Sequence, residues 1–502
     1  MKRRDHKIVA KRKNNLEKRL DRRSGYGTGK AVFAGGNLRY EMSDRTKGVE
    51  YGGIGAIHQM IQGLRLDQAL NENLRLLKIR SPYYESDHIL NMAYNILTGA
   101  TCLEGVERLR EKESYMDAIG AVRIPDPTTA GDFCRRFTDE ESLVTLMEIF
   151  NDIRESVWDK QDESFFEEAV VDIDTTIAET NGECKEGIGL SYKGTWGYSP
   201  LLISLQNTGE PLYLVNRSGN TPSSKDIARW IDRALSRLSK RFNKTVLRGD
   251  TAISLTEKLD EWAERATFYF GYDAMPNLVK IADALERPCW KRLGRHPKYE
   301  VKTKPRGPRE NVKDRIVEEN GYKQLRLEQE DVAEFDYQPG NCKKTYRLVV
   351  VRKTIRVTQG QLELTPEVRY FFYITNNWTC SPEEVVFEAN KRCDQENLFG
   401  QFHSGMHVMR MPLDNLYSNW AYMVIAALAW SLKAWYAMLA PDKQKSKQLL
   451  RMKFKTFREN IIQIPCQILK TGGEIVGRII SYNSWLRTFF DTFDVIRRMR
   501  CT

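Results

Sequence analysis

Metal-binding and disulfide-forming patterns are scarce in this sequence of 502 residues. Its nine cysteines are scattered without any C-x-x-C pair, and of its six histidines only His403 and His407 lie close together. These spacings exclude a zinc ribbon and a disulfide framework, and they are typical of a protein of the reducing cytosol. A signal peptide is not expected either, because the N-terminal MKRRDHKIVAKRK contains no apolar segment.

Long hydrophobic runs are also lacking. The most apolar run covers residues 421–432, too short to cross a bilayer, and predicts a buried helix rather than a membrane span. Basic residues outnumber acidic ones by a formal net charge of +11, and this excess favours a polyanionic partner, nucleic acid before membrane. We therefore expect a cytoplasmic, nucleoid-associated protein that binds DNA and no membrane.

The chain is long enough for several domains, and its composition changes along its length. The first 45 residues, rich in lysine, arginine and then glycine, predict a basic flexible arm that contacts phosphates. We predict six segments: the arm at 1–45, a helical DNA-binding domain at 46–160, the first part of an α/β core at 165–275, a β-rich basic insertion at 276–368, the second part of the core at 369–440, and basic C-terminal helices at 441–502.

The hydrophobic period changes to two at Ala169, in the stretch VVDIDTTIA. A strand there places Val171 and Ile173 on one face and the two acids Asp172 and Asp174 on the other. Carboxylates clustered on a half-buried strand repel each other, and a bound cation would relieve that repulsion. The alternative is an edge strand whose acids face water.

Two further acids accompany this strand. Asp250 ends the strand-like TVLRGD, at the kind of position where open α/β folds place their chemistry. The stretch from Ser381 to His403 predicts a helix with a capping box, because Ser381 is followed by Pro382 and, at the third position, by Glu384.

Arg392 and Glu396 lie four residues apart on that predicted helix, and so on one face of it. The order of elements, three strands followed by helix, strand, helix, insertion, strand and helix, is that of an RNase H-like core, in which Asp174, Asp250 and Glu396 converge. Three carboxylates suit two Mg²⁺ or Mn²⁺ ions and phosphodiester chemistry.

The insertion contains Trp290 among Lys291, Arg292 and Arg295. An aromatic ring surrounded by basic side chains can stack on an unpaired base, although packing explains such a ring as often. We therefore regard Trp290, Arg292 and Arg295 as candidate DNA contacts.

The chain resembles the DDE transposases of bacterial insertion sequences, in the branch with a Y-x2-R-x3-E-x6-K signature. Within that branch it is most similar to the insertion-sequence family numbered thirteen-eighty. The motifs that carry the resemblance are D-x-T at 174–176, G-x2-GY-x-P at 194–200, R-x-GN at 217–220, LRGD at 247–250, TNN at 375–377 and R-x3-EN at 392–397.

The resemblance implies metal-dependent cutting at terminal inverted repeats and strand transfer into target DNA, by a homodimer that brings two element ends together. It implies that Asp174, Asp250 and Glu396 hold the metals, that Arg392 contacts a phosphate, and that Thr176 and His403 lie near DNA. Ala389 stands where the signature has tyrosine and His403 where it has lysine. Asp172 competes with Asp174 for the first position, and we prefer Asp174 because it lies nearer the strand end.

Two other functions are consistent with the sequence. A catalytically inactive DNA-binding protein derived from a transposase would need only the basic segments. Another RNase H-like nuclease, such as a junction resolvase, would cut DNA without joining it to a target.

Overall fold

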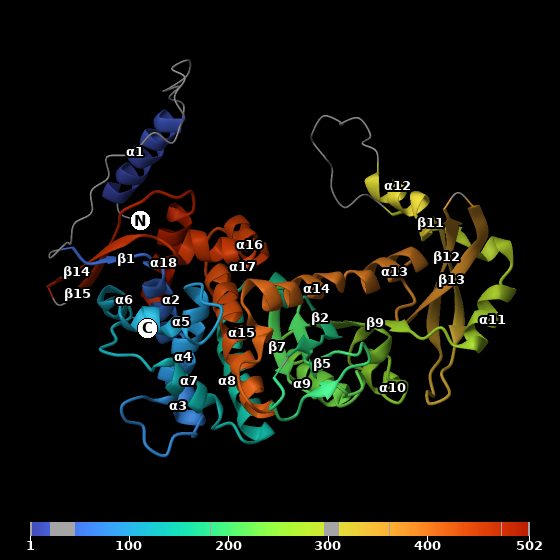
Figure 1. Ribbon diagram of the computed structural model, residues 1–502, viewed down its shortest axis with the longest axis horizontal. Coiled ribbons are helices and arrows are strands. Elements are labelled where there is room, and N and C mark those ends of the chain that lie inside the picture. Colours follow the sequence, from blue (N-terminus) through green and yellow to red (C-terminus); the bar gives the residue numbers. More distant parts are fainter. Residues whose placement is uncertain are drawn as a thin grey trace.

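The structure is a computed structural model that describes residues 3–20, 46–180, 182–295, 311–360, 362–472 and 474–499. It has a mixed α/β architecture with a large sheet, as the sequence predicts. Helical layers lie at one end of the molecule and long strands at the other (Figure 1). Parts of two predictions lie outside the described residues: the end of the arm at 21–45 and the basic stretch at 296–310 of the insertion.

The N-terminal region is helical. Residues 3–20, predicted as part of a flexible arm, form a helix here. The elements in this region are α1 (Arg3–Leu20), β1 (Gly48–Val49), α2 (Ile54–Gly63), α3 (Leu66–Asn73), α4 (Glu85–Leu97), α5 (Gly105–Arg110), α6 (Glu113–Ile119), α7 (Pro127–Cys134) and α8 (Glu140–Trp158).

Among the described residues nine strands form one sheet, in the order β10-β11-β12-β13-β9-β8-β2-β6-β7. The predicted insertion therefore extends the core sheet beyond β9, and we call strands β10–β13 the wing. The strands are β2 (Glu168–Thr175), β6 (Leu201–Leu205), β7 (Glu210–Val215), β8 (Lys244–Gly249), β9 (Thr267–Tyr272), β10 (Lys291–Arg292), β11 (Lys323–Tyr337), β12 (Tyr346–Gln359) and β13 (Leu362–Thr375).

Strand directions change within the sheet. β2 pairs antiparallel with β6, and β6 antiparallel with β7, whereas β8 and β9 run parallel to β2. The wing strands are antiparallel to their neighbours. The helices between these strands are α9 (Ile227–Leu238), α10 (Leu259–Trp262), α11 (Pro276–Ala284) and α12 (Val312–Glu319).

The helix α15 (Leu416–Met438) is the centre of the core. Among the described residues it is the one helix long and apolar enough to cross a membrane, and its apolar stretch is entirely buried inside the protein. It packs against α4, α7 and α8 from the N-terminal region and against β7 of the sheet. The predicted buried helix at 421–432 is therefore confirmed.

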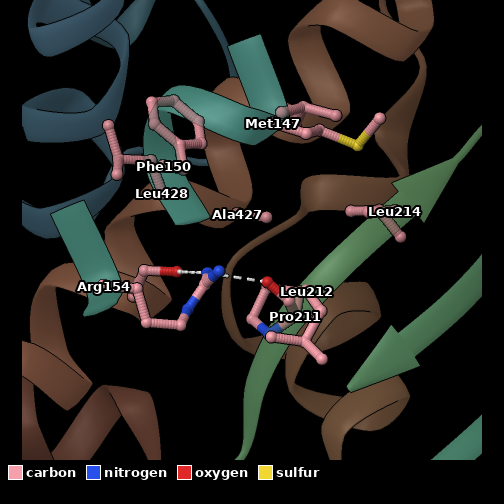
Figure 2. Close-up of a pocket in the computed structure, with 10 residues that line it drawn as sticks. Met147, Phe150, Arg154, Pro211, Leu212, Leu214, Ala427 and Leu428 are labelled. Atoms are coloured by element: carbon pink, nitrogen blue, oxygen red, sulfur yellow. Dashed lines mark hydrogen bonds between the residues drawn. The ribbon is translucent and has the colours of Figure 1, made fainter. Parts of the chain in front are cut away.

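A buried polar network ties these three layers together. The Arg154 guanidinium on α8 donates to the Glu210 carboxylate on β7 at 2.9 Å. It also donates to the Pro211 carbonyl at 2.7 Å (Figure 2). From α15, the Trp435 indole N–H also donates to Glu210, at 2.7 Å. The small cavity beside Arg154, about 20 Å³, has room for one water molecule. The network fixes the helical region against the sheet.

The C-terminal region contains strands that the sequence analysis missed. Its elements are α16 (Lys443–Arg451), α17 (Phe454–Phe457), β14 (Cys466–Thr471), β15 (Glu474–Ile479) and α18 (Leu486–Met499). β14 pairs with β1, so the two ends of the described chain meet in one small sheet. α1 joins them, because the Arg12 side chain donates to the Ile479 carbonyl at 2.9 Å.

The predicted helix from Ser381 to His403 begins as expected but is not continuous. The Ser381 hydroxyl accepts from the Glu384 N–H at 3.3 Å, and the Glu384 carboxylate accepts from the Ser381 N–H at 2.7 Å, which confirms the capping box. The helix then divides into α13 (Pro382–Asn390) and α14 (Cys393–Gly400), followed by a π-helical turn at Gln401–Gly405. α13 packs on β8, β9 and the wing, whereas α14 packs on β2, so the break lets the two halves follow a twisted sheet.

Replacing Ser381 by alanine is expected to lower the free energy of unfolding by about 1 kcal/mol, because the first turn of α13 loses its cap. Urea denaturation measures this change. The exposed Ser239, after α9, is a control whose replacement by alanine should change stability by no more than about 0.5 kcal/mol. Equal effects of the two substitutions would contradict the capping role.

Candidate functional site

The register between β2 and β8 builds the site. Asp172 pairs with Arg248, and Ile173 with Gly249, so that Asp174 and Asp250 follow side by side at the ends of two parallel strands. Side chains two residues apart point to the same face of a strand. Asp172 and Asp174 therefore share a face with Arg248 and Asp250.

The first row across the two strands, Asp172 beside Arg248, is neutral. The Arg248 guanidinium donates to both carboxylate oxygens of Asp172, at 2.6 and 2.9 Å, and each side chain is only 2% exposed. A second carboxylate, that of Glu388 on α13, lies 3.8 Å from Arg248. Asp172 therefore belongs to a buried structural ion pair, although the sequence placed it in competition with Asp174.

The second row, Asp174 beside Asp250, carries like charges. Burial raises the pKa of Asp174 to about 6, with further contributions from the charges of Asp250 and Glu396. The backbone N–H of Thr175, which Asp174 accepts at 2.7 Å, and the Arg392 guanidinium oppose this rise. Asp250 and Glu396 are thus both within electrostatic reach of Asp174. A bound cation would neutralise this second row, as Arg248 neutralises Asp172 in the first.

Asp250 follows β8 and caps a single 3-10 turn, Thr251–Ile253, where its carboxylate accepts from the Ala252 N–H at 3.0 Å. A cavity of about 280 Å³ lies at this end of the sheet. It is lined chiefly by hydroxyl side chains: Ser223, Ser224, Thr251, Ser254, Thr256 and Tyr272. The end of the sheet that carries the carboxylates is therefore open and polar.

The third carboxylate comes from α14, which a buried glutamine holds to the sheet. The Gln395 amide donates to the backbone carbonyls of Asp172 and Leu202, at 3.0 and 2.9 Å, and the residue is 2% exposed. Glu396, the next residue, is exposed. The Arg392 guanidinium, one turn earlier, lies 3.7 Å from the Asp174 carboxylate.

The donor set of Asp174, Asp250 and Glu396 consists of carboxylate oxygens, which suit hard cations such as Mg²⁺ and Mn²⁺. Within the described ranges, however, no three Asp, Glu, His or Cys side chains lie close enough to hold one metal ion together. The carboxylates fit the cation in chemistry and in charge, and they would have to draw closer to bind it.

Two further predicted residues lie side by side. The Thr176 hydroxyl, after β2, and the His403 Nε2, after α14, are 3.5 Å apart. Partial desolvation lowers the pKa of His403, which favours the neutral imidazole at neutral pH.

The three candidate DNA contacts of the insertion differ in their surroundings. The Arg352 guanidinium covers the Trp290 ring at 4.1 Å from its centroid, so packing accounts for this ring. Arg295 donates to Glu330 at 2.9 Å, and Arg292 is exposed on β10. Burial raises the pKa of the Tyr373 phenol, and the charges of Arg295 and Arg392 oppose part of this rise.

Sequence reasoning missed Arg248 and Gln395. Arg248 left a signal in the sequence. In LRGD it lies two residues before Asp250, just as Asp172 lies two residues before Asp174. A basic residue opposite one of two acids predicts which acid is neutralised, once the strands are aligned. Gln395 left none, because its partners are backbone carbonyls of other elements.

Comparison with known proteins gives the family. The model of the family described as transposase DDE domain, group 1, matches residues 48–501, and the chain belongs to this family. Membership assigns the chain to DNA transposition and to a class of enzymes that uses divalent metal ions.

A solved cryo-EM structure of the piggyBac transposase synaptic complex with hairpin DNA aligns with 82% of this chain and 81% of that chain, at 9% identity and a TM-score of 0.36. No curated protein matches the chain.

Proposed function

We propose that this protein is a metal-dependent DNA transposase that cuts phosphodiester bonds at the ends of a mobile element and joins the ends to target DNA. The observation that carries the proposal is the pair of carboxylates Asp174 and Asp250 at adjacent strand ends, whose negative charge Arg392 offsets only in part, with Glu396 in electrostatic reach of Asp174, in a member of a transposase family. The neighbouring pair along the same two strands, Asp172 and Arg248, is neutral, so the excess of negative charge is confined to the strand ends.

We infer that the core is RNase H-like. The strand order β7-β6-β2-β8-β9, antiparallel up to β2 and parallel after it, supports this inference. The helix that supplies Glu396 lies across the same sheet, and the wing is the insertion before it (Figure 1).

Asp174, Asp250 and Glu396 would hold two Mg²⁺ or Mn²⁺ ions. Such ions activate the attacking oxygen and support the leaving oxygen when they are bound. Arg392, whose side chain is 30% exposed and lies beside Asp174, would turn to a DNA phosphate. Thr176 and His403 would contact the same strand, and Arg292 the flanking duplex.

The finer identity rests on the sequence motifs. We propose a transposase of a bacterial insertion sequence, most similar to the family numbered thirteen-eighty, that acts at terminal inverted repeats in the cytoplasm. Because two element ends must be joined to one target, the active form would be a homodimer on double-stranded DNA.

An inactive DNA-binding protein is the second candidate. The observation that favours it is the exposed Glu396, together with the lack of a three-ligand metal group in the part of the chain that the structure describes. Such a protein would bind DNA without cutting it.

Metal dependence separates the two candidates. Purified protein is expected to nick, and then join, a supercoiled plasmid carrying element ends when Mg²⁺ or Mn²⁺ is present. Removal of the metal with EDTA should abolish both reactions, and excess Mg²⁺ should restore them. DNA binding without cutting in either metal would favour the inactive protein, and cutting without joining would favour a resolvase-like nuclease.

A further inference from the structure

Two sequence motifs outside the carboxylate site meet in a small hairpin. Strands β4 (Gly189–Leu190) and β5 (Trp196–Tyr198) pair antiparallel, and β3 (Ala178–Glu179) pairs with β5 on its other side. The turn between β4 and β5 is closed by the Ser191 N–H, which donates to the Thr195 carbonyl at 2.8 Å. Gly194 occupies the left-handed region there, with φ of +74°.

The R-x-GN motif clamps the base of this hairpin. A Cβ on Gly219 would meet the Gly189 and Gly197 carbonyl oxygens at 2.4 and 2.5 Å, so three backbone segments touch where only glycine fits. The buried Arg217 side chain donates to the Ser199 carbonyl at 3.0 Å. Burial lowers the pKa of Arg217 to about 10, a cost that is consistent with a structural role in holding the loop.

The clamped hairpin presents large side chains to solvent. Tyr192 is 84% exposed, Trp196 56% and Leu190 48%. The Lys193 ammonium lies 5.5 Å from the centre of the Tyr192 ring. A rigid support under exposed aromatic side chains is typical of an interaction surface.

The hairpin sheet follows directly after β2, the strand that carries Asp174. The Thr176 N–H donates to the Pro200 carbonyl at 3.0 Å, and Ala178 pairs with Tyr198. The base of the hairpin therefore begins within a few residues of the carboxylates, on the end of the sheet where they lie.

We propose that the rings of Tyr192 and Trp196 stack on unpaired bases of the DNA strand next to the cut. This inference rests on the proposed function and adds a second contact surface to it. Aromatic rings stack on any base, and such contacts typically strengthen binding by about tenfold per base. Lys193 supplies a cation for the neighbouring phosphate.

The charge around the hairpin favours stacking over phosphate binding. The exposed Glu179, Glu183 and Glu186 precede it in the chain and outnumber the two lysines of this stretch, Lys185 and Lys193. The contribution of the two rings to affinity should therefore depend little on salt, unlike phosphate contacts, which weaken steeply as salt rises.

The test compares two DNA probes with the full-length protein: a blunt duplex and the same duplex with a short single-stranded extension. The wild type is expected to prefer the extended probe over the blunt duplex by about tenfold or more, at both low and high salt. The double substitution Tyr192→Ala, Trp196→Leu should reduce this preference to less than about twofold, whereas Trp196→Phe should retain it. Both side chains are exposed, and thermal melting checks that the variants fold.

Tyr322 is a matched control, since it is an aromatic residue 59% exposed just before β11. Tyr322→Ala should keep the preference for the extended probe. A double variant that keeps the preference, or a wild type without one, overturns the inference even when plasmid cutting is normal. A wild type that shows the preference but cuts DNA with no metal overturns the proposed catalysis and leaves the hairpin surface standing.

Discussion

Replacing Asp174 or Asp250 by asparagine is expected to reduce DNA cutting by about a thousandfold or more, with DNA binding unchanged. Asparagine keeps the size of the side chain but removes the charge, and an amide oxygen is a much poorer ligand for a divalent ion than a carboxylate. Plasmid nicking in Mg²⁺ measures the first effect, and anisotropy of a labelled duplex measures the second.

The matched control is Glu179→Gln on β3, an exposed carboxylate a few residues beyond Asp174 in the chain. It should cut DNA at the wild-type rate. Glu396→Gln should behave like the two aspartate variants once α14 carries its carboxylate to the site. Cutting by any of the three variants at the wild-type rate would remove that residue from the metal site.

Replacing Asp172 by alanine is expected to lower the free energy of unfolding by about 3–5 kcal/mol. The reason is that Arg248 is buried and would lose the carboxylate that accepts both of its hydrogen bonds. Urea denaturation followed by circular dichroism measures the loss. A double variant with Asp172→Leu and Arg248→Met should recover much of it, because it leaves no unpaired buried charge.

Asp174→Asn provides the contrast, because it removes a carboxylate whose charged form is disfavoured by burial and by its neighbours. It should leave stability unchanged or raise it, while abolishing cutting. The two acids of one D-x-D stretch thus separate by measurement: one affects stability and the other activity. Equal loss of stability in both variants would contradict this separation.

The alternation along 169–177 could be predicted from the sequence because it is local. Val171 and Ile173 are fully buried, as expected, and the two acids share the other face. That face, however, is covered by α13 and α14, and the partner of each acid is set by the register of β2 against β8, whose paired residues lie 76 positions further on. Long-range register leaves no local pattern, so Asp172 could not be assigned from the sequence.

The helix start at Ser381 could likewise be read locally, whereas the break between Asn390 and Cys393 could not. No proline or glycine marks it, and its cause is the sheet beneath, which α13 and α14 follow in different places. The two-residue strand β1 escaped prediction for a similar reason. It is too short to show a period, and it forms a strand because β14, from the other end of the chain, lies beside it.

The wing has a mechanical consequence. β12 and β13 are long strands that pair along most of their length, whereas β13 meets β9 only over Phe372–Thr375. Helix α13 also packs on the wing, β9 and β8, so the wing is a stiff unit that one short strand pairing and one helix join to the rest of the sheet. β9 also pairs with β8, whose end carries Asp250. A force on the tip of the wing is therefore transmitted through β9 and β8 to the carboxylates.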